Sequence, residues 1–320
     1  MRRAVVSIPM TTRFRGITTR EALLVQGPAG WGEFGPFLEY DDAEARSWWA
    51  AAAEAAIDGF PPAIRPRVPV NVTVAAVGPE AAMRAVRSSG GCTTAKVKVA
   101  EPGQYEADDL ERLEAVRAAL GPSGRVRIDV NGGWDVDTAL ARLPHYERAA
   151  GGLEYVEQPC PSVTELAEVR RRGSVPVAAD ESIRRSDDPL RVVAAEAADV
   201  VVLKVAPLGG VRACLRLAER LGLPVVVSSA LETSVGLAAG VALAAALPEL
   251  PYACGLATGS LLSGDVTADP MRPVEGQLEV RPVVVDEARL AALAAPADRS
   301  EWWERRWAAV TSTEAGAVRA

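Results

Sequence analysis

From residue 70 to residue 258, short Val-rich segments alternate with longer segments rich in Ala, Leu and Arg. The short segments are apolar throughout, which is typical of parallel strands buried on both faces, and the longer ones have the length of helices. The pattern predicts eight strands, at 70–74, 95–99, 126–131, 153–159, 176–182, 199–205, 224–229 and 252–258. It predicts seven helices between them, at 79–88, 106–120, 135–149, 162–172, 187–197, 209–221 and 234–246.

This repeat predicts a parallel sheet covered by helices, and eight such strands suggest a closed barrel. A doubly wound open sheet is the alternative, but no G-x-G-x-x-G follows the strand at 70–74. We therefore expect an α/β fold built around a barrel.

Two further regions flank the repeat. Residues 1–65 predict a small α+β unit, in which two strands are joined around "GPAG" and a helix runs from "DDAEA" to Gly59. The Pro-rich stretch "PPAIRPRVP" separates this unit from the repeat. Residues 266–320 include an aromatic helix, "RSEWWERRWAAV", and we expect this segment to return to the N-terminal unit.

Composition excludes several classes of protein. The net charge is −7 and no basic tract is present, so we expect no nucleic-acid partner. The apolar run "VGLAAGVALAAAL" is too short to span a membrane, and the start of the chain lacks the apolar core of a signal peptide. The four cysteines are widely spaced without a C-x-x-C pair, which favours a cytoplasmic protein with reduced cysteines. The sequence leaves the oligomeric state open and is compatible with a monomer.

The histidine content limits the chemistry, because His145 is the only histidine. A metal site built from several histidines is impossible. Acid–base catalysis must then come from Lys, Asp, Glu, Tyr or Cys.

Ionisable residues end five of the predicted strands, in the order K-V-K, D-V-N, E-Q-P, D-E-S and L-K. In a barrel, the carboxyl ends of the strands carry the functional site. Asp129, Glu157 and Asp180 end three consecutive strands, and their charges would repel one another at the roughly 5 Å spacing of adjacent strands. A hard divalent cation would remove this repulsion, and oxygen-only ligands favour Mg²⁺. Helix N-capping is the competing explanation for single carboxylates at these positions.

Lysines flank this trio. Lys96 and Lys98 are two residues apart on one strand and therefore share a face, while Lys204 ends the strand after the trio. Lysines that protect an edge strand from aggregation are the alternative explanation. A metal-bound carboxylate makes its adjacent carbon acidic, so we expect Lys98 to act as a base whose pKa the neighbouring Lys96 lowers.

The set K-x-K, D-x-N, E-Q-P, D-E-S and a lone lysine resembles the enolase superfamily, in particular its muconate-lactonising subgroup. The resemblance covers nearly the whole chain, including "GWGEF" near the N-terminus. It implies a (β/α)7β modified TIM barrel over residues 66–265. It also implies an α+β capping domain formed by residues 1–65 and joined by residues 266–320.

The resemblance also implies roles for the strand-end residues. Asp129, Glu157 and Asp180 would bind Mg²⁺, with Mn²⁺ as a possible substitute. Lys98 would remove the proton next to a ring carboxylate, Lys204 would stabilise the enediolate from the other face, and Lys96 would support Lys98. Residues expected to contact the substrate or to orient these groups are Asn131, Glu181, Ser228, Ser229, Gly255 and Arg15.

The implied reaction is the dehydration of a cyclohexadiene carboxylate to an aromatic acid, a step of menaquinone biosynthesis, with a small-molecule carboxylate as substrate. An N-succinylamino acid racemase or a dipeptide epimerase of the same superfamily is the main alternative, because both need a lysine on each face of the substrate. A Schiff-base aldolase with Lys204 as nucleophile and a non-catalytic binding protein are the remaining alternatives. The aldolase leaves the carboxylate trio unexplained, and a binding protein has no reason to keep two lysines opposed across a metal.

Overall fold

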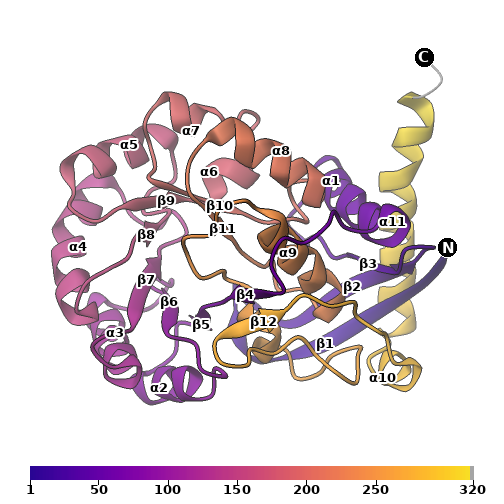
Figure 1. The fold of residues 1–320 in the computed structure, drawn as a ribbon, viewed down its shortest axis with the longest axis horizontal. Coiled ribbons are helices and arrows are strands. Elements are labelled where there is room, and N and C mark those ends of the chain that lie inside the picture. The colour runs from indigo at the N-terminus through magenta and orange to yellow at the C-terminus, as the bar shows by residue number, and fades with distance from the viewer. Residues whose placement is uncertain (318–320) are drawn as a thin grey trace.

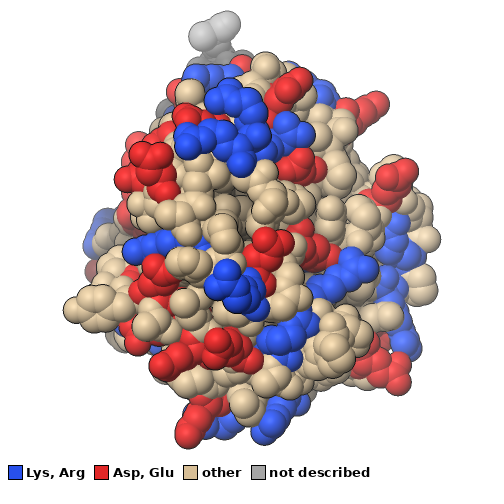
Figure 2. Space-filling view, turned by 90° about the vertical axis from the view of Figure 1, so that its left-hand side faces the viewer, with Lys and Arg blue, Asp and Glu red and all other residues tan. Residues whose placement is uncertain are grey.

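The computed structural model describes the backbone of residues 1–317 and the side chains of residues 1–312. A curled parallel sheet ringed by helices forms one part of the molecule, and an antiparallel sheet with two long helices lies against it (Figure 1). Basic side chains are interspersed with Asp and Glu over the barrel face seen in Figure 2. Within residues 1–317, no helix is both long and apolar enough to cross a bilayer.

The parallel sheet confirms the α/β class. Its seven strands follow the order β11-β10-β9-β8-β7-β6-β5, and every neighbouring pair is parallel. The strands are β5 (Val72–Val74), β6 (Thr94–Lys98), β7 (Arg125–Asp129), β8 (Val156–Glu157), β9 (Val177–Ala179), β10 (Val200–Leu203) and β11 (Val225–Val227).

The prediction of an eighth strand at 252–258 is wrong, although this segment does lie between the two ends of the parallel sheet. Cys254 and Gly255 form single parallel bridges with Val70 and Ser228, respectively. The chain then turns into the 3-10 helix η2 (Ala257–Leu261). Pro251 lacks an N–H group and Gly255 lacks a side chain to pack, so a longer ladder is disfavoured here.

Helices pack around this sheet largely where the sequence predicts them. They are α2 (Pro79–Arg87), α3 (Glu106–Leu120), α4 (Val136–Ala150), α5 (Val163–Arg172), α8 (Val211–Leu221) and α9 (Ser234–Ala246). The helix predicted at 187–197 is an exception, since only α7 (Arg191–Ala194) forms there, after α6 (Glu181–Arg184). Pro189 explains the late start, because a proline disfavours helical backbone at the residue before it. At the other end, Glu196 has φ 49°, which is incompatible with a continued helix.

The N-terminal region forms an antiparallel sheet in the order β1-β2-β3, with β1 (Arg2–Phe14), β2 (Ile17–Gln26) and β3 (Trp31–Phe34). Helix α1 (Asp42–Ala53) follows and continues as the π-helical segment η1 (Glu54–Asp58). Gly59 ends it with φ 67°, a conformation that favours glycine.

The C-terminal segment returns to this region. Strand β12 (Gln277–Glu279) pairs with β4 (Arg67–Pro69), and α10 (Glu287–Ala292) leads to α11 (Ala297–Ala317), which packs on α1, β1 and β2 (Figure 1). The buried Trp303 on α11 meets the Phe34 ring edge-on, with ring centroids 6.0 Å apart. Aromatic packing therefore joins the two ends of the chain.

Candidate active site

A small cavity lies at the carboxyl ends of the barrel strands, beneath the turn that joins β1 to β2. Its volume is about 30 Å³, so side chains fill most of the space between the barrel and the N-terminal region. It is lined by Phe14, Arg15, Phe37, Thr73, Lys96, Lys98, Asp129, Asn131, Arg184, Lys204, Ser228, Ser229, Ala230, Leu231 and Thr258.

Every lysine of the chain lines this cavity, because Lys96, Lys98 and Lys204 are the only lysines in 320 residues. All other side chains that carry a permanent positive charge are arginines. A lysine can lose its proton near neutral pH when its surroundings lower its pKa, whereas an arginine cannot. The distribution of lysine therefore singles out this cavity for proton transfer.

Lys96 lies over the end of β8. Its Nζ atom donates to both carboxylate oxygens of Glu157, at 2.8 and 3.0 Å, and lies 3.3 Å from Oδ2 of Asp129. Burial acts to lower the pKa of Lys96, but the Glu157 and Asp129 carboxylates outweigh it and hold the pKa above its ordinary value. Lys96 therefore stays charged in this arrangement.

Lys98 is held by two acceptors at the end of β7 and in the turn that follows. Its Nζ atom donates to Oδ2 of Asp129 at 2.5 Å and to Oδ1 of Asn131 at 2.6 Å. Asn131 adopts a left-handed backbone, with φ 52°, which directs its amide toward both Lys98 and Glu181. The Phe14 ring centroid lies 5.5 Å from the Lys98 ammonium.

Lys204 faces Asp180 from the end of β10. Its Nζ atom lies 2.5 Å from Oδ2 of Asp180, and the other oxygen of Asp180 accepts from Nε of Arg184 at 2.9 Å. Burial lowers the pKa of Lys204, and the positive charges of Arg184 and Lys96 add to this effect against the opposing effect of Asp180. Lys204 therefore gives up its proton more readily than an exposed lysine.

The three carboxylates at the strand ends repel one another. Asp129, Glu157 and Asp180 are all buried, and Asp129 is paired in register with Glu157 on the next strand. Burial raises the pKa of Glu157 to about 7, and the negative charges of Asp129 and Asp180 add to the rise. For Asp129, burial acts in the same direction, but Lys98 and Lys96 hold its pKa well below the ordinary value.

This donor set fits a hard divalent cation in its chemistry, since it consists of buried carboxylate oxygens that lie close enough to repel one another. The three carboxylates do not surround one point in this structure. Each is paired instead with an ammonium group: Asp129 with Lys98, Glu157 with Lys96 and Asp180 with Lys204. Within the described part of the chain, no group of three acidic, Cys or His side chains is arranged around a metal position.

The other predicted site residues divide into two groups. Arg15, Asn131, Ser228 and Ser229 line the cavity, and Ser229 is fixed by hydrogen bonds to Glu232 and Thr258. Glu181 and Gly255 lie beside it. Glu181 is held by Asn131 and Arg184, and Gly255 belongs to the barrel wall, where its carbonyl accepts from the backbone N–H of Ser229.

Sequence reasoning missed Arg184, Phe14 and Phe37, which also line the cavity. Arg184 had a local signal, because it stands four residues after Asp180, on the same face of one helical turn. Phe14 and Phe37 had none, because Phe14 ends β1 and Phe37 lies in the loop after β3, and both meet the barrel only in the folded chain.

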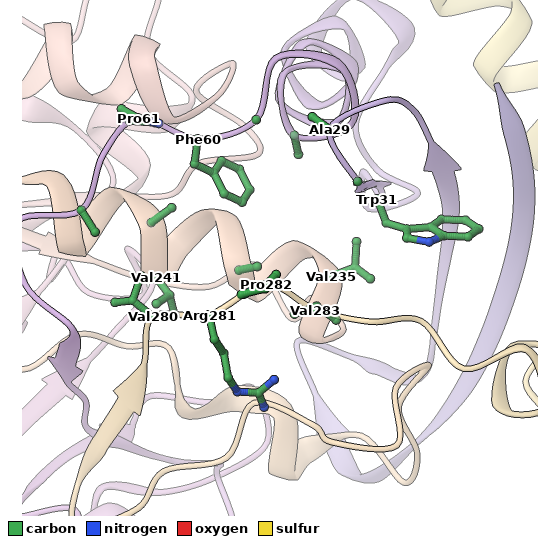
Figure 3. A pocket seen from close by; sticks show the side chains of 16 residues that line it. Ala29, Trp31, Phe60, Pro61, Val235, Val241, Val280, Arg281, Pro282 and Val283 are labelled. Carbon is green, nitrogen blue, oxygen red and sulfur yellow. The ribbon is translucent and has the colours of Figure 1, made fainter.

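A larger, apolar hollow of about 360 Å³ lies elsewhere, between α9 and the connector at Phe60 and Pro61 (Figure 3). Its walls include Val235, Val241 and Val283, and Arg281 is its one charged lining residue. The Arg281 guanidinium is itself paired with Asp269 at 3.1 Å. This hollow offers no acid–base pair, and we therefore place the candidate active site at the lysines.

Comparison with known proteins identifies the family of the chain. Residues 79–283 match the family described as Enolase C-terminal domain-like, and residues 5–56 match Enolase N-terminal domain-like. The chain is 68% identical to an o-succinylbenzoate synthase of Thermobifida fusca over 96% of both chains. It is 56% identical to the o-succinylbenzoate synthase of Mycobacterium tuberculosis strain H37Rv over 93% of this chain and 90% of that protein.

Solved structures support the fold. Muconate lactonizing enzyme from Pseudomonas fluorescens, in complex with muconolactone, superposes with a TM-score of 0.78 at 21% identity, over 92% of this chain and 98% of that one. The L-Ala-D/L-Glu epimerase of Bacillus subtilis superposes with a TM-score of 0.74 at 21% identity, over 89% of this chain and 96% of that one. At this level of identity, the likeness concerns the fold alone.

Proposed function

Because the chain belongs to the enolase superfamily, we propose that it acts as an o-succinylbenzoate synthase. The reaction removes water from 2-succinyl-6-hydroxy-2,4-cyclohexadiene-1-carboxylate and yields 2-succinylbenzoate, a step of menaquinone biosynthesis. A proton leaves the carbon next to the ring carboxylate, the neighbouring hydroxyl leaves with a proton, and the ring becomes aromatic. The observation that carries the proposal is the gathering of all three lysines of the chain at one cavity, each against a buried carboxylate.

Charge balance supports a doubly negative substrate together with a divalent cation. Four acidic groups, Asp129, Glu157, Asp180 and Glu181, are matched by four basic groups, Lys96, Lys98, Lys204 and Arg184, before Lys98 releases its proton to act as the base. A dication would add two positive charges to this balanced cluster. The ring carboxylate and the succinyl carboxylate of the substrate would supply the two negative charges that restore balance.

Asp129, Glu157 and Asp180 would hold Mg²⁺, which members of this superfamily typically use and for which Mn²⁺ is a possible substitute. When bound, the metal supplies a Lewis acid that neutralises the charge of the enediolate. Lys98 would accept the proton at Nζ and then, as an ammonium ion, assist the departure of the hydroxyl. Lys204 would stabilise the enediolate from the opposite face, and Lys96 would keep its positive charge close to Lys98.

The two parts of the molecule would have different roles in the reaction. We assign residues 66–265 to the catalytic barrel, and residues 1–65 with 266–320 to a capping domain that closes the cavity through Phe14, Arg15 and Phe37. Arg15, Ser228 and Ser229 would meet the succinyl chain, while Asn131 and Glu181 would orient Lys98 and Arg184. The described cysteines are all free and buried, which supports a cytoplasmic location.

The test is to offer the purified chain the cyclohexadiene substrate and, in parallel, N-succinyl amino acids and dipeptides. We expect aromatisation, followed by ultraviolet absorbance, that requires Mg²⁺. Racemisation or epimerisation without any aromatisation would overturn the proposal in favour of the sister activities. Trapping of substrate on Lys204 by borohydride would instead indicate an aldolase.

A further inference from the structure

The N-terminal region supports the cavity wall at a second place, away from the β1–β2 turn. The turn from β11 to α9, residues 228–232 and here named the β11–α9 turn, lines the cavity with Ser228, Ser229, Ala230 and Leu231. Leu231 has φ 66°, a left-handed conformation that is unfavourable for a residue with a side chain. Such a residue persists only where its surroundings hold it.

Two hydrogen bonds hold the backbone of Leu231. Its N–H donates to Oγ of Ser229 at 2.8 Å, and its carbonyl accepts from Nε of Arg20 at 3.0 Å. Arg20 belongs to β2, is 3% exposed and also donates to the carbonyl of Gly35. A buried guanidinium from the N-terminal sheet therefore reaches across to the β11–α9 turn.

Glu33, on β3, fixes the other end of the same turn. Its Oε2 atom accepts from the backbone N–H groups of Thr233 and Gly236, each at 3.1 Å, and from the Thr233 hydroxyl at 2.6 Å. These N–H groups belong to the first turn of α9, which leaves them without partners inside the helix. Gly236 leaves room for this packing, since a Cβ atom there would lie 2.5 Å from Cβ of Glu232 and 3.0 Å from the Glu33 carboxylate oxygen.

We propose that Glu33, together with Arg20, is a positioning residue that holds the β11–α9 turn, and with it strained Leu231, in place against the active-site cavity. Glu33 reaches the cavity only through α9 and the turn, and it is not itself among the lining residues. The expected effect of Glu33 on catalysis rests on the proposed function. Its role in holding the β11–α9 turn rests on these contacts alone.

Glu54 provides a matched control. It comes from η1 in the same region and caps a neighbouring barrel helix, α8, by accepting from the backbone N–H groups of Val211 and Arg212. Its carboxylate also binds the Arg212 side chain at 2.8 Å. Glu54 thus makes the same kind of contact between the two parts of the molecule, but on a helix that does not follow the β11–α9 turn.

The experiment compares Glu33→Gln with Glu54→Gln by hydrogen–deuterium exchange and by steady-state kinetics on the cyclohexadiene substrate. For Glu33→Gln we expect amide exchange in residues 229–236 to be about tenfold faster and KM to rise about tenfold, with kcat changed less than about threefold. For Glu54→Gln we expect faster exchange at 211–212 and an unchanged KM. Equal kinetic effects of the two substitutions, or unaltered exchange at 229–236 in Glu33→Gln, would overturn the proposal.

A second measurement examines the strain directly. Glycine adopts φ 66° without cost, so Glu33→Gln should raise KM less in a Leu231→Gly background than in the wild type. Identical effects in both backgrounds would contradict the role of Leu231. If Glu33→Gln does not fold, Glu33→Asp, which keeps the charge but shortens the reach, serves in the same comparison. If wild-type protein lacks dehydration activity, the proposed function fails, while exchange at 229–236 still decides whether Glu33 holds the turn.

Discussion

Lys204 donates a hydrogen bond to Asp180 across 2.5 Å, and both side chains are at least nine-tenths buried. Asp180 shares its second oxygen with Arg184, so the carboxylate serves two cations. Burial lowers the pKa of Lys204, and its effect exceeds the opposing effect of the ion pair with Asp180. This relationship makes Lys204 a buried cation that is held in place while its proton is weakly bound.

The lysine content makes these protonation states directly measurable. Protein labelled with ¹³C only in lysine should give three Cε signals, all from the cavity, because the chain has three lysines. We expect one signal, Lys204, to titrate below the ordinary lysine range, and another, Lys96, to remain charged throughout the accessible pH range. Assignment by Lys96→Arg and Lys204→Arg identifies each signal. Three signals that titrate together near the ordinary pKa would contradict the electrostatics described above.

Replacement of either proposed catalytic lysine should abolish turnover. Lys98→Ala removes the base, and Lys204→Ala removes the charge on the opposite face, so we expect kcat to fall by about 10²–10⁴ or more in each variant. Circular dichroism should show an intact fold, since both side chains end at the cavity. Turnover similar to that of the wild type in either variant would contradict the mechanism.

Mg²⁺ should bind at the three strand-end carboxylates and raise the thermal midpoint, because a ligand that binds only the folded state stabilises it. Asp180→Asn should weaken this effect and the dependence of activity on Mg²⁺. Asp135→Asn is the control, since Asp135 caps α4 outside the cavity and Asn caps helices equally well. Full activity of the wild type in excess EDTA would refute the metal assignment.

Glu33 should make stability depend on pH. Burial raises its pKa from 4.5 to about 7, with Glu232 adding to the rise and Arg20 opposing it. Between these two values the folded chain keeps a proton at Glu33 that the unfolded chain has lost, so this group makes the protein less stable as pH rises. From pH 4.5 to pH 7, the unfolding free energy of the wild type should therefore fall relative to that of Glu33→Gln by on the order of 3 kcal/mol.

Urea unfolding at several pH values, followed by fluorescence, measures this difference. A constant difference between wild type and Glu33→Gln would show that Glu33 has an ordinary pKa in the folded protein.

Trp303 should contribute more to stability than its neighbour Trp302. Trp303 is 1% exposed, packs on Phe34 and donates from Nε1 to Glu21 at 3.0 Å, whereas Trp302 is only partly buried. We expect Trp303→Ala to lower the free energy of unfolding by about 3–5 kcal/mol and Trp302→Ala to cost clearly less. Equal losses in chemical denaturation would show that α11 is not held mainly through Trp303.

The sequence by itself determined the repeat of strands and helices, because a strand buried on both faces must be continuously apolar and a covering helix must have a length to match. It also determined which residues end the strands, and a parallel barrel brings all such ends to one side. That is why Lys98, Asp129, Glu157, Asp180 and Lys204 could be grouped from the chain alone. These local rules did not extend to residues 252–258, where Pro251 and Gly255 reduce a predicted strand to single bridges.

Only the tertiary structure decided what meets the barrel from outside it. Phe14 and Phe37 reach the cavity, and Glu33 reaches α9, across about 200 residues of sequence. No periodicity encodes such contacts, because they depend on how one region packs on another and not on the spacing of residues along the chain. The partner of each ammonium group was likewise settled by side-chain packing, since any of the three lysines could have faced any of the three carboxylates at the same end of the barrel.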